Sequence, residues 1–406
     1  MTNRRSPNVT EPHRDAGASV ATRYAAVMGL AVVAACARPA PSTRPEPTTE
    51  HSHDRSLKAA FAGSFLVGAA LNQDQFTEQD QRGAAIVKAQ FNTITSENVL
   101  KWERVHPRPG QYQFALPDKY VEFGERNSMF VVGHVLVWHQ QTPGWVFEDS
   151  TGAPVSRDTL LARLRDHIHT VVGRYRGRVK GWDVVNEAVD EDGKLRKTPW
   201  LAIIGEDYIE RAFEFAHEAD PGAELYYNDY SVENAPKRNG VIALIRRLQA
   251  AGVPVAAVGL QGHDKMNWPT VAQQDSTLAA FAALGVKVNI TELDIDVLPA
   301  ATRSQSAEVT LSTALAARLD PYVGGLPDSV QLALARRYAE LFGVYMKYRD
   351  VIERVTFWGV TDRDSWLNGW PVRGRTSHPL LFDREGRPKP AFDAVIRMTH
   401  PEPPVP

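Results

Sequence analysis

The sequence has very little cysteine, since Cys36 is the only one among 406 residues. No disulfide can form within the chain, and no zinc site built on several cysteines is available. An excess of charge of either sign is also missing, because 46 Lys and Arg stand against 48 Asp and Glu, a formal net charge of −2. Phosphate binding needs a basic surplus, so nucleic acid is not expected as the main partner.

Signs of a disordered or low-complexity chain are few. Gly (28) and Pro (27) are near ordinary usage, and the hydrophobic and charged fractions of 43% and 23% are typical of a soluble globular protein. Wholesale disorder would need low hydrophobicity with high net charge. The length fits one large domain or two ordinary ones.

Patterns for metal or serine chemistry are missing as well. No His-Glu-x-x-His pattern occurs, and no serine lies in a nucleophile-elbow context. We therefore expect no metal ion and no cofactor. Any catalysis must then rest on carboxylates and other polar side chains.

The N-terminal stretch, residues 1–36, has the order of a secretion signal. Basic residues come first, and residues 25–35 are uncharged and apolar. This run is shorter than the roughly 20 residues that span a bilayer. Val33-Ala34-Ala35-Cys36 resembles a bacterial lipobox, which implies lipidation of Cys36 and export, with the protein secreted or anchored at a membrane. The alternative is a misplaced start codon before an ordinary apolar stretch.

Residues 37–56 are rich in proline and polar side chains, including Pro39, Pro41, Pro45 and Pro47. Such a tract cannot bury a core and is typical of a semi-rigid linker. The sequence therefore predicts a folded domain over residues 57–400, with no second domain after it.

From Leu57 onward, apolar runs alternate with helical patterns. Eight runs rich in Val, Ile, Phe or Tyr are typical of strands buried on both faces; they are Phe65–Leu71, Phe91–Glu97, Met129–Trp138, Val179–Glu187, Ala223–Ser231, Ala256–His263, Val286–Ile295 and Arg354–Asp362. Eight such repeats predict an α/β fold with a single (β/α)8 TIM barrel and long loops on its C-terminal face, above all residues 296–328. A doubly wound sheet is the rival, but it would show a Gly-rich turn after its first strand, where this chain has Ala69-Ala70-Leu71-Asn72.

The helical patterns are clearest in four segments. Apolar residues recur at helical spacing in Ser329–Tyr348, and Asp328 or Ser329 is expected to cap that helix. Similar patterns cover Arg157–Arg174, Tyr208–Ala219 and Lys237–Ala251.

Polar and aromatic residues gather at the ends of seven strand runs. These are Glu97 and Asn98; His134, Trp138, His139 and Gln141; Asp183, Asn186 and Glu187; Asn228, Asp229 and Tyr230; Gln261 and His263; Glu292 and Asp294; Trp358, Asp362 and Trp366. Active sites of these barrels form at the C-terminal rim. A single polar residue at the end of a strand is usually a cap or makes a structural hydrogen bond. Polar residues at the same end of seven strands indicate a functional site.

Two of these residues are glutamates: Glu187 is the last residue of the fourth strand run, and Glu292 lies near the end of the seventh. Paired carboxylates are what glycoside cleavage requires, one protonated and the other ionised. Indole rings suit a sugar ligand because pyranose faces stack on them, and Trp102, Trp138, Trp358 and Trp366 fall near this rim. Trp182 and Trp200 are expected to fill the core.

The segments Trp182-Asp183-Val184-Val185-Asn186-Glu187 and Ile290-Thr291-Glu292-Leu293-Asp294 resemble the two catalytic segments of glycoside hydrolase family 10, the endo-β-1,4-xylanases. The resemblance runs from Leu57 to about Met398. It includes Ser96-Glu97-Asn98 with Lys101-Trp102-Glu103, Gly133-His134 with Trp138-His139, Asn228-Asp229-Tyr230, Gly259-Leu260-Gln261-Gly262-His263 and Phe357-Trp358-Gly359-Val360.

The resemblance implies a monomeric endo-acting enzyme that hydrolyses xylan and xylo-oligosaccharides with retention. It implies that Glu187 is the acid/base, that Glu292 is the nucleophile, and that His263, oriented by Asp294, hydrogen-bonds Glu292. Asn186 would bind the 2-hydroxyl of the sugar under attack, and Tyr230 would lie near the catalytic pair. The other implied substrate-binding residues are Glu97, Asn98, Lys101, His134, Trp138, Gln141, Gln261, Trp358 and Trp366.

Two positions depart from the family pattern. Ser231 stands where Asn is common, and Asp264 where an aromatic is frequent; both positions bear on the leaving-side subsites. Two other functions compete with xylan cleavage. One is a barrel glycosidase acting on another β-1,4-glucan or on mannan, and the other is a non-catalytic sugar-binding barrel. The presence of both glutamates disfavours the latter.

Overall fold

The computed structural model describes residues 56–299 and 318–399. The predicted signal peptide, Cys36 and all but the last residue of the predicted linker lie outside the described residues, as do residues 300–317 of the predicted long loop. Among the helices of the described ranges, none is both long and apolar enough to cross a membrane.

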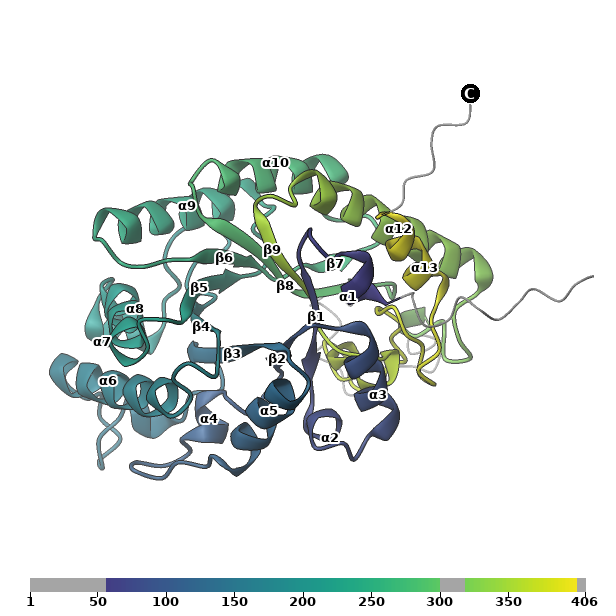
Figure 1. Cartoon of the computed structure of the whole chain (residues 1–406). Helices are drawn as coiled ribbons and strands as arrows, with labels where there is room; N and C mark the ends of the chain where they lie inside the picture. Colours follow the sequence, from purple (N-terminus) through teal and green to yellow (C-terminus); the bar gives the residue numbers. More distant parts are fainter. Residues whose placement is uncertain (1–55, 300–317, 400–406) are drawn as a thin grey trace, which may run out of the picture. The chain divides into compact units, whose positions relative to one another are not determined.

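Eight parallel strands close into a barrel (Figure 1), which confirms the predicted (β/α)8 architecture. In chain order, each pairs with the next, β6 pairs with β8, and β9 pairs back with β1. The strands are β1 (Leu66–Leu71), β2 (Thr93–Ser96), β3 (Phe130–Val137), β4 (Gly181–Asn186), β5 (Glu224–Asp229), β6 (Ala257–Leu260), β8 (Lys287–Asp296) and β9 (Ile352–Phe357).

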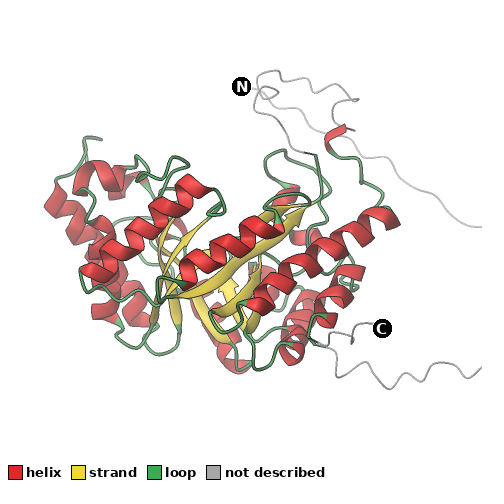
Figure 2. Cartoon of the chain, turned by 90° about the horizontal axis from the view of Figure 1, so that it is seen from above, coloured by secondary structure: helices red, strands yellow, loops and turns green. Residues whose placement is uncertain are grey.

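Helices surround the strands, as Figure 2 shows from a second direction. The larger ones are α3 (Gln81–Gln90), α5 (Ala115–Arg126), α6 (Arg157–Arg174), α8 (Tyr208–Ala219), α9 (Ala235–Ala250), α10 (Val271–Ala282), α12 (Asp328–Lys347) and α13 (Pro390–Arg397). A short helix, α1 (Leu57–Ala60), precedes β1. Other short ones lie in the connections: α2 (Gln73–Phe76), α4 (Trp102–Val105), α7 (Pro199–Ile204), and the 3-10 turns η1 (Gly144–Val146), η3 (Asp362–Asp364) and η4 (Trp366–Asn368).

The barrel strands are continuous apolar runs because both of their faces are covered. All six residues of β4 are buried. Trp182 of β4 is fully buried and fills the core, as predicted. Its ring lies against Gly133 of β3, where an added Cβ would stand only 2.1 Å from the indole. Gly133 is therefore required for the close packing of β3 and β4.

The sixth predicted strand differs from the observed one. It ends at Leu260, the chain turns at Gly262, whose φ is +74°, and a short strand β7 (His263–Lys265) then pairs with β8. Glycine adopts this left-handed backbone without a steric penalty. The turn sets His263 directly opposite Asp294 in the β7–β8 register.

The predicted cap of the last long helix is wrong. Asp328 is already the first residue of α12, the preceding position is Pro327, and no side chain caps the helix. A carboxylate in the first helical turn is still favourable, because it faces the positive end of the helix dipole.

Candidate active site

The side chains predicted to form the site lie at the C-terminal ends of the barrel strands. Glu97, Asn98 and Lys101 follow β2; His134 lies in β3, with Trp138 and Gln141 after it; Asn186 ends β4 and Glu187 follows it; Tyr230 follows β5; Gln261 follows β6; His263 begins β7; Glu292 and Asp294 lie in β8; Trp358 and Trp366 follow β9. Direct contacts link most of these residues into one site.

Glu292 lies in a chain of charged and aromatic partners. His263 contacts Glu292 Oε2 through Nε2 and Asp294 Oδ1 through Nδ1, each at 3.1 Å. The second oxygen of Asp294 accepts a hydrogen bond from Trp366 Nε1 at 2.7 Å. Both neighbours of the imidazole are carboxylates, so the ring satisfies them when both of its nitrogens carry a proton.

The pKa values agree with this arrangement. Burial disfavours a charge on His263, but the carboxylates of Asp294 and Glu292 outweigh it and raise the pKa of His263 to about 10. Burial would likewise raise the pKa of Glu292. The hydrogen bond from His263 and the charges of His134, His263 and Lys101 hold that pKa below its usual range. Glu292 is thus an ionised carboxylate at neutral pH.

Asn228, at the end of β5, is a contact of Glu292 that the predicted set of site residues omits. Its Nδ2 donates to Glu292 Oε1 at 2.8 Å and to Asn186 Oδ1 at 3.0 Å. Its Oδ1 accepts from Thr291 Oγ1 at 2.6 Å, which fixes the amide orientation. The signal was present in the sequence, because Asn228 belongs to the polar group Asn228-Asp229-Tyr230 near the end of the fifth strand run.

Glu187 accepts hydrogen bonds at Oε1 from Gln261 Nε2 at 3.0 Å and from Asn186 Nδ2 at 3.1 Å. Gln261 Nε2 also reaches Asn186 Oδ1 at 3.3 Å. The amides of Gln261, Asn186 and Asn228 therefore connect the two glutamates by a continuous series of hydrogen bonds.

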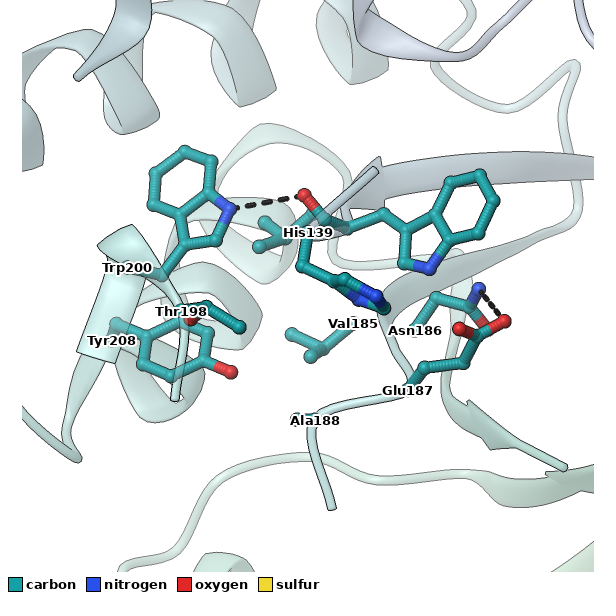
Figure 3. A pocket seen from close by; sticks show the side chains of 10 residues that line it. His139, Val185, Asn186, Glu187, Ala188, Thr198, Trp200 and Tyr208 are labelled. Carbon is teal, nitrogen blue, oxygen red and sulfur yellow. Dashed lines mark hydrogen bonds between the residues drawn. The ribbon is translucent and has the colours of Figure 1, made fainter. Parts of the chain in front are cut away.

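A pocket behind Glu187 is lined by His139, Thr198, Trp200 and Tyr208 (Figure 3). Burial lowers the pKa of His139, and the positive charge of Arg196 adds to this effect, while Glu187 opposes it. Trp200 is buried, as predicted for a core residue, and its Nε1 donates to the carbonyl of Trp138 at 3.0 Å. Trp200 thereby fixes the backbone of a residue in the site.

The residues after β2 form a second part of the site. Lys101 is buried; its Nζ donates to Asn98 Oδ1 at 3.3 Å and lies 4.9 Å from the ring centre of Trp138. Burial lowers the pKa of Lys101 and raises that of Glu97, although each group's charge opposes the shift of the other. The indole Nε1 of Trp138 is buried without a hydrogen-bond partner in the structure.

Of the three remaining substrate-binding candidates, His134 of β3 and Trp358 after β9 contact this framework, whereas the side chain of Gln141 pairs with Glu103. His134 Nδ1 lies 2.9 Å from Asp183 Oδ2, and its ring meets Trp358 edge to face at 5.4 Å. Trp358 also contacts His263, with ring centres 6.3 Å apart. Gln141 donates from Nε2 to Glu103 Oε1 at 2.9 Å.

Tyr230 lies between two cations. Its hydroxyl accepts from Arg196 Nη2 at 2.9 Å, and Lys237 Nζ stands 3.4 Å from its ring centre. Lys237 is fully buried and pairs with Asp229 at 3.0 Å. These partners fix the ring of Tyr230 beside the loop that follows Glu187.

Trp102 corrects one sequence-based expectation. It is only 2% exposed, and its indole stacks on the imidazole of His167 with ring centres 3.6 Å apart. The ring therefore faces the helix side of the barrel and not a sugar, because a stacked histidine already covers it. Its neighbour Lys101 reaches the site instead.

The described side chains include no cluster of three or more His, Cys, Asp or Glu able to hold a metal ion. The site combines the ionised carboxylate of Glu292 with the carboxyl group of Glu187 and with aromatic rings around both. Such a pair of carboxylates can cleave a glycosidic bond.

Comparison with known proteins agrees with this chemistry. The chain is 44% identical over 343 residues to endo-1,4-β-xylanase A of Xylanibacter ruminicola, covering 84% of this chain and 93% of that protein. It is 41% identical to endo-1,4-β-xylanase B of Paenibacillus barcinonensis, covering 84% and 97%. A solved GH10 endoxylanase from a sugarcane soil metagenome superimposes with a TM-score of 0.80 at 44% identity, covering 85% of this chain and 99% of that one. The sequence model of glycosyl hydrolase family 10 matches residues 56–398, and the chain belongs to that family.

Proposed function

We propose that this protein is an endo-1,4-β-xylanase that hydrolyses internal β-1,4-xylosidic bonds of xylan by a retaining double displacement. The observation that carries the proposal is the pair Glu187 and Glu292, joined through three side-chain amides in a barrel of family 10. The matched relatives named as endo-1,4-β-xylanases support xylan as the substrate.

In the first step, the ionised carboxylate of Glu292 attacks the anomeric carbon. The bond from that carbon to the leaving oxygen breaks, and Glu187 donates a proton to this oxygen. Glu292 is suited to attack because the bonds from His263 and Asn228 keep its carboxylate charged and oriented.

In the second step, Glu187 acts as the base. It takes a proton from water, the water oxygen attacks the anomeric carbon, and the ester bond to Glu292 breaks. Glu187 regains its proton, and the sugar product keeps its β configuration. The amides of Gln261 and Asn186 hold the Glu187 carboxyl through both proton transfers.

The polar residues around this pair would bind two consecutive sugars on the non-reducing side of the cut. Asn186 would bind the 2-hydroxyl of the sugar under attack, and Glu97, Asn98 and Lys101 the next sugar. His134, Gln141, Trp138, Gln261, Trp358 and Trp366 would line the cleft around both, with Asp294 orienting His263 and with Tyr230 near the catalytic pair.

The stereochemistry of the first product tests the mechanism. We expect NMR of xylohexaose hydrolysis to show the β-anomer first, followed by slow mutarotation. Initial release of the α-anomer would mean that water attacks directly and that Glu292 is not the nucleophile.

We also propose that the protein is exported and anchored at a membrane through a lipid on Cys36, with residues 37–56 as the linker to a monomeric catalytic domain. The basic and apolar order of residues 1–35 supports this proposal.

A further inference from the structure

Glu187 has an unusual backbone for a non-glycine residue. Its φ is +57°, in the left-handed region, where the Cβ of an L-residue lies too close to the following carbonyl oxygen. Such conformations persist only where the surroundings determine them. The amide of Glu187 donates to the carbonyl of Asn228 at 2.8 Å, which fixes one side of this residue.

Arg196 fixes the carbonyl side of Glu187. Its Nε donates to the carbonyl oxygen of Glu187 at 3.0 Å, and its Nη2 lies 3.4 Å from the carbonyl of Val189. The same Nη2 donates to the hydroxyl of Tyr230 at 2.9 Å. The Arg196 side chain is 17% exposed, and its Nη1 also pairs with Asp190 Oδ1 at 3.5 Å.

The segment that carries Arg196 returns to the residues just after Glu187. The Arg196 amide donates to the carbonyl of Ala188 at 2.7 Å, and Val189 and Leu195 form an antiparallel bridge. The amides of Ala188 and Val189 each donate to the hydroxyl of Tyr227, at 3.1 Å. Residues 188–196 are therefore a small hairpin that is fixed at its base, directly beside the acid/base candidate.

We propose that Arg196 is a positioning residue that holds the backbone of Glu187 in the conformation from which its carboxyl donates a proton. This inference rests on the proposed role of Glu187 as the acid/base. Without the guanidinium, the carbonyl of Glu187 loses its partner, and the left-handed residue can relax toward a right-handed conformation. The carboxyl then moves relative to the leaving oxygen, and a displacement of about 1 Å can reduce a rate by about 100-fold.

The expected signature is a dependence on the leaving group. Breaking a bond to a poor leaving group requires a proton from Glu187, whereas a very good one departs without it. Aryl β-xylobiosides present this range with no sugar on the leaving side, so a lost contact between Arg196 and a leaving-side sugar cannot produce the effect.

The experiment measures kcat/KM for dinitrophenyl, nitrophenyl and phenyl β-xylobioside with the full-length chain. It compares Arg196→Met and Arg196→Lys with Glu187→Ala and with the control Lys194→Met. Lys194 lies on the same hairpin, is 82% exposed and pairs with Asp192 at 2.9 Å. Thermal unfolding of each variant shows whether it is folded at the assay temperature.

We expect Arg196→Met to reduce kcat/KM about 10- to 100-fold on the phenyl substrate and less than about 2-fold on the dinitrophenyl substrate. This is no more than part of the roughly 100- to 10,000-fold that general acid catalysis contributes. Arg196→Lys should show the same trend with a smaller loss, since an ammonium cannot reach the two carbonyls and the hydroxyl together. Lys194→Met should match the unmodified enzyme on all three substrates.

An equal loss on all three substrates, or no loss in either Arg196 variant, would overturn the inference. Arg196→Lys decides the question if Arg196→Met does not fold. The Glu187→Ala variant distinguishes a failure of the inference about Arg196 from a failure of the proposed function. If Glu187→Ala shows the leaving-group dependence and the Arg196 variants do not, Glu187 is the acid and only the positioning by Arg196 is wrong.

Discussion

Asn228 at the end of β5 donates a hydrogen bond from Nδ2 to Oε1 of Glu292 in β8 over 2.8 Å. The amide cannot rotate away, because Thr291 donates to its oxygen at 2.6 Å and its second N–H is directed at Asn186. Each oxygen of Glu292 thus has a donor, with Asn228 on one and His263 on the other.

Removal of this donor should weaken the nucleophile. A hydrogen bond to a charged group contributes about 1.5–3 kcal/mol, so we expect Asn228→Ala to reduce kcat/KM on nitrophenyl β-xylobioside by about 10- to 100-fold. Thr291→Val, which frees the amide without deleting it, should cost less. Steady-state kinetics of both variants check this expectation, and an Asn228→Ala enzyme with unchanged kcat/KM would contradict it.

The two glutamates should respond differently to replacement. Glu187→Ala should retain activity on dinitrophenyl β-xylobioside, and azide should accelerate its turnover and give a β-glycosyl azide, because the small anion needs no base. Glu292→Ala should be nearly inactive on every substrate, with any azide product in the α configuration. Product NMR distinguishes the two configurations. A β-azide from Glu292→Ala would show that another group is the nucleophile.

His263 should make stability depend on pH at the alkaline side. Its folded pKa of about 10 lies above the ordinary value of 6.5, so the folded state binds this proton more tightly than the unfolded state. The resulting stabilisation is complete below pH 6.5 and is lost as the pH rises through about 10. Urea unfolding at both pH values should show a larger difference between the unmodified protein and His263→Gln at the lower one. A difference that is constant or grows with pH would refute the prediction.

Substrate choice should follow the size of the sugar. A xylose ring lacks the hydroxymethyl group of glucose, and Lys101, Gln141, Trp358 and Trp366 are expected to crowd the position where that group would lie. We expect kcat/KM to be much higher on xylo-oligosaccharides than on cello-oligosaccharides of equal length. Equal values would favour the alternative of a broader β-1,4-glucanase.

Mass spectrometry of the native N-terminus tests the proposed anchor. We expect the mature chain to begin at Cys36 with a lipid attached. Each lipid CH₂ that enters a bilayer contributes about 0.8 kcal/mol to binding. Cys36→Ala should release the protein into the soluble fraction. A free thiol at Cys36, or cleavage at another residue, would exclude the anchor.

The barrel could be predicted from the sequence because its strands are buried on both faces. Such strands appear in the sequence as short apolar runs. The helices Arg157–Arg174 and Tyr208–Ala219 have the predicted bounds, since Ser156 caps the former and the latter has a strongly apolar face. The break at Gly262 could not be predicted, because a glycine within an apolar run does not reveal its φ. It shortens the sixth strand and creates β7.

The parts of the site that escaped prediction act through contacts distant in sequence. Arg196 reaches Glu187 and Tyr230 from a loop that carries no strand-end signal. Trp102 appeared to belong to the sugar-binding rings because of its place beside Lys101, but His167, from α6, covers its face. Both facts depend on how helices and loops fold back on the barrel, which periodicity does not encode.

Closure of the sheet also affects how concentrated protein behaves. Because β6 pairs with β8 and β9 with β1, the eight barrel strands of the described chain leave no open row of amides and carbonyls. The outer side of β7 is the exception, and it is only three residues long. Long exposed strand edges are the templates on which sheets of different molecules join into aggregates. Association at high protein concentration would therefore have to proceed through side chains or through unfolding, and not through growth of the native sheet.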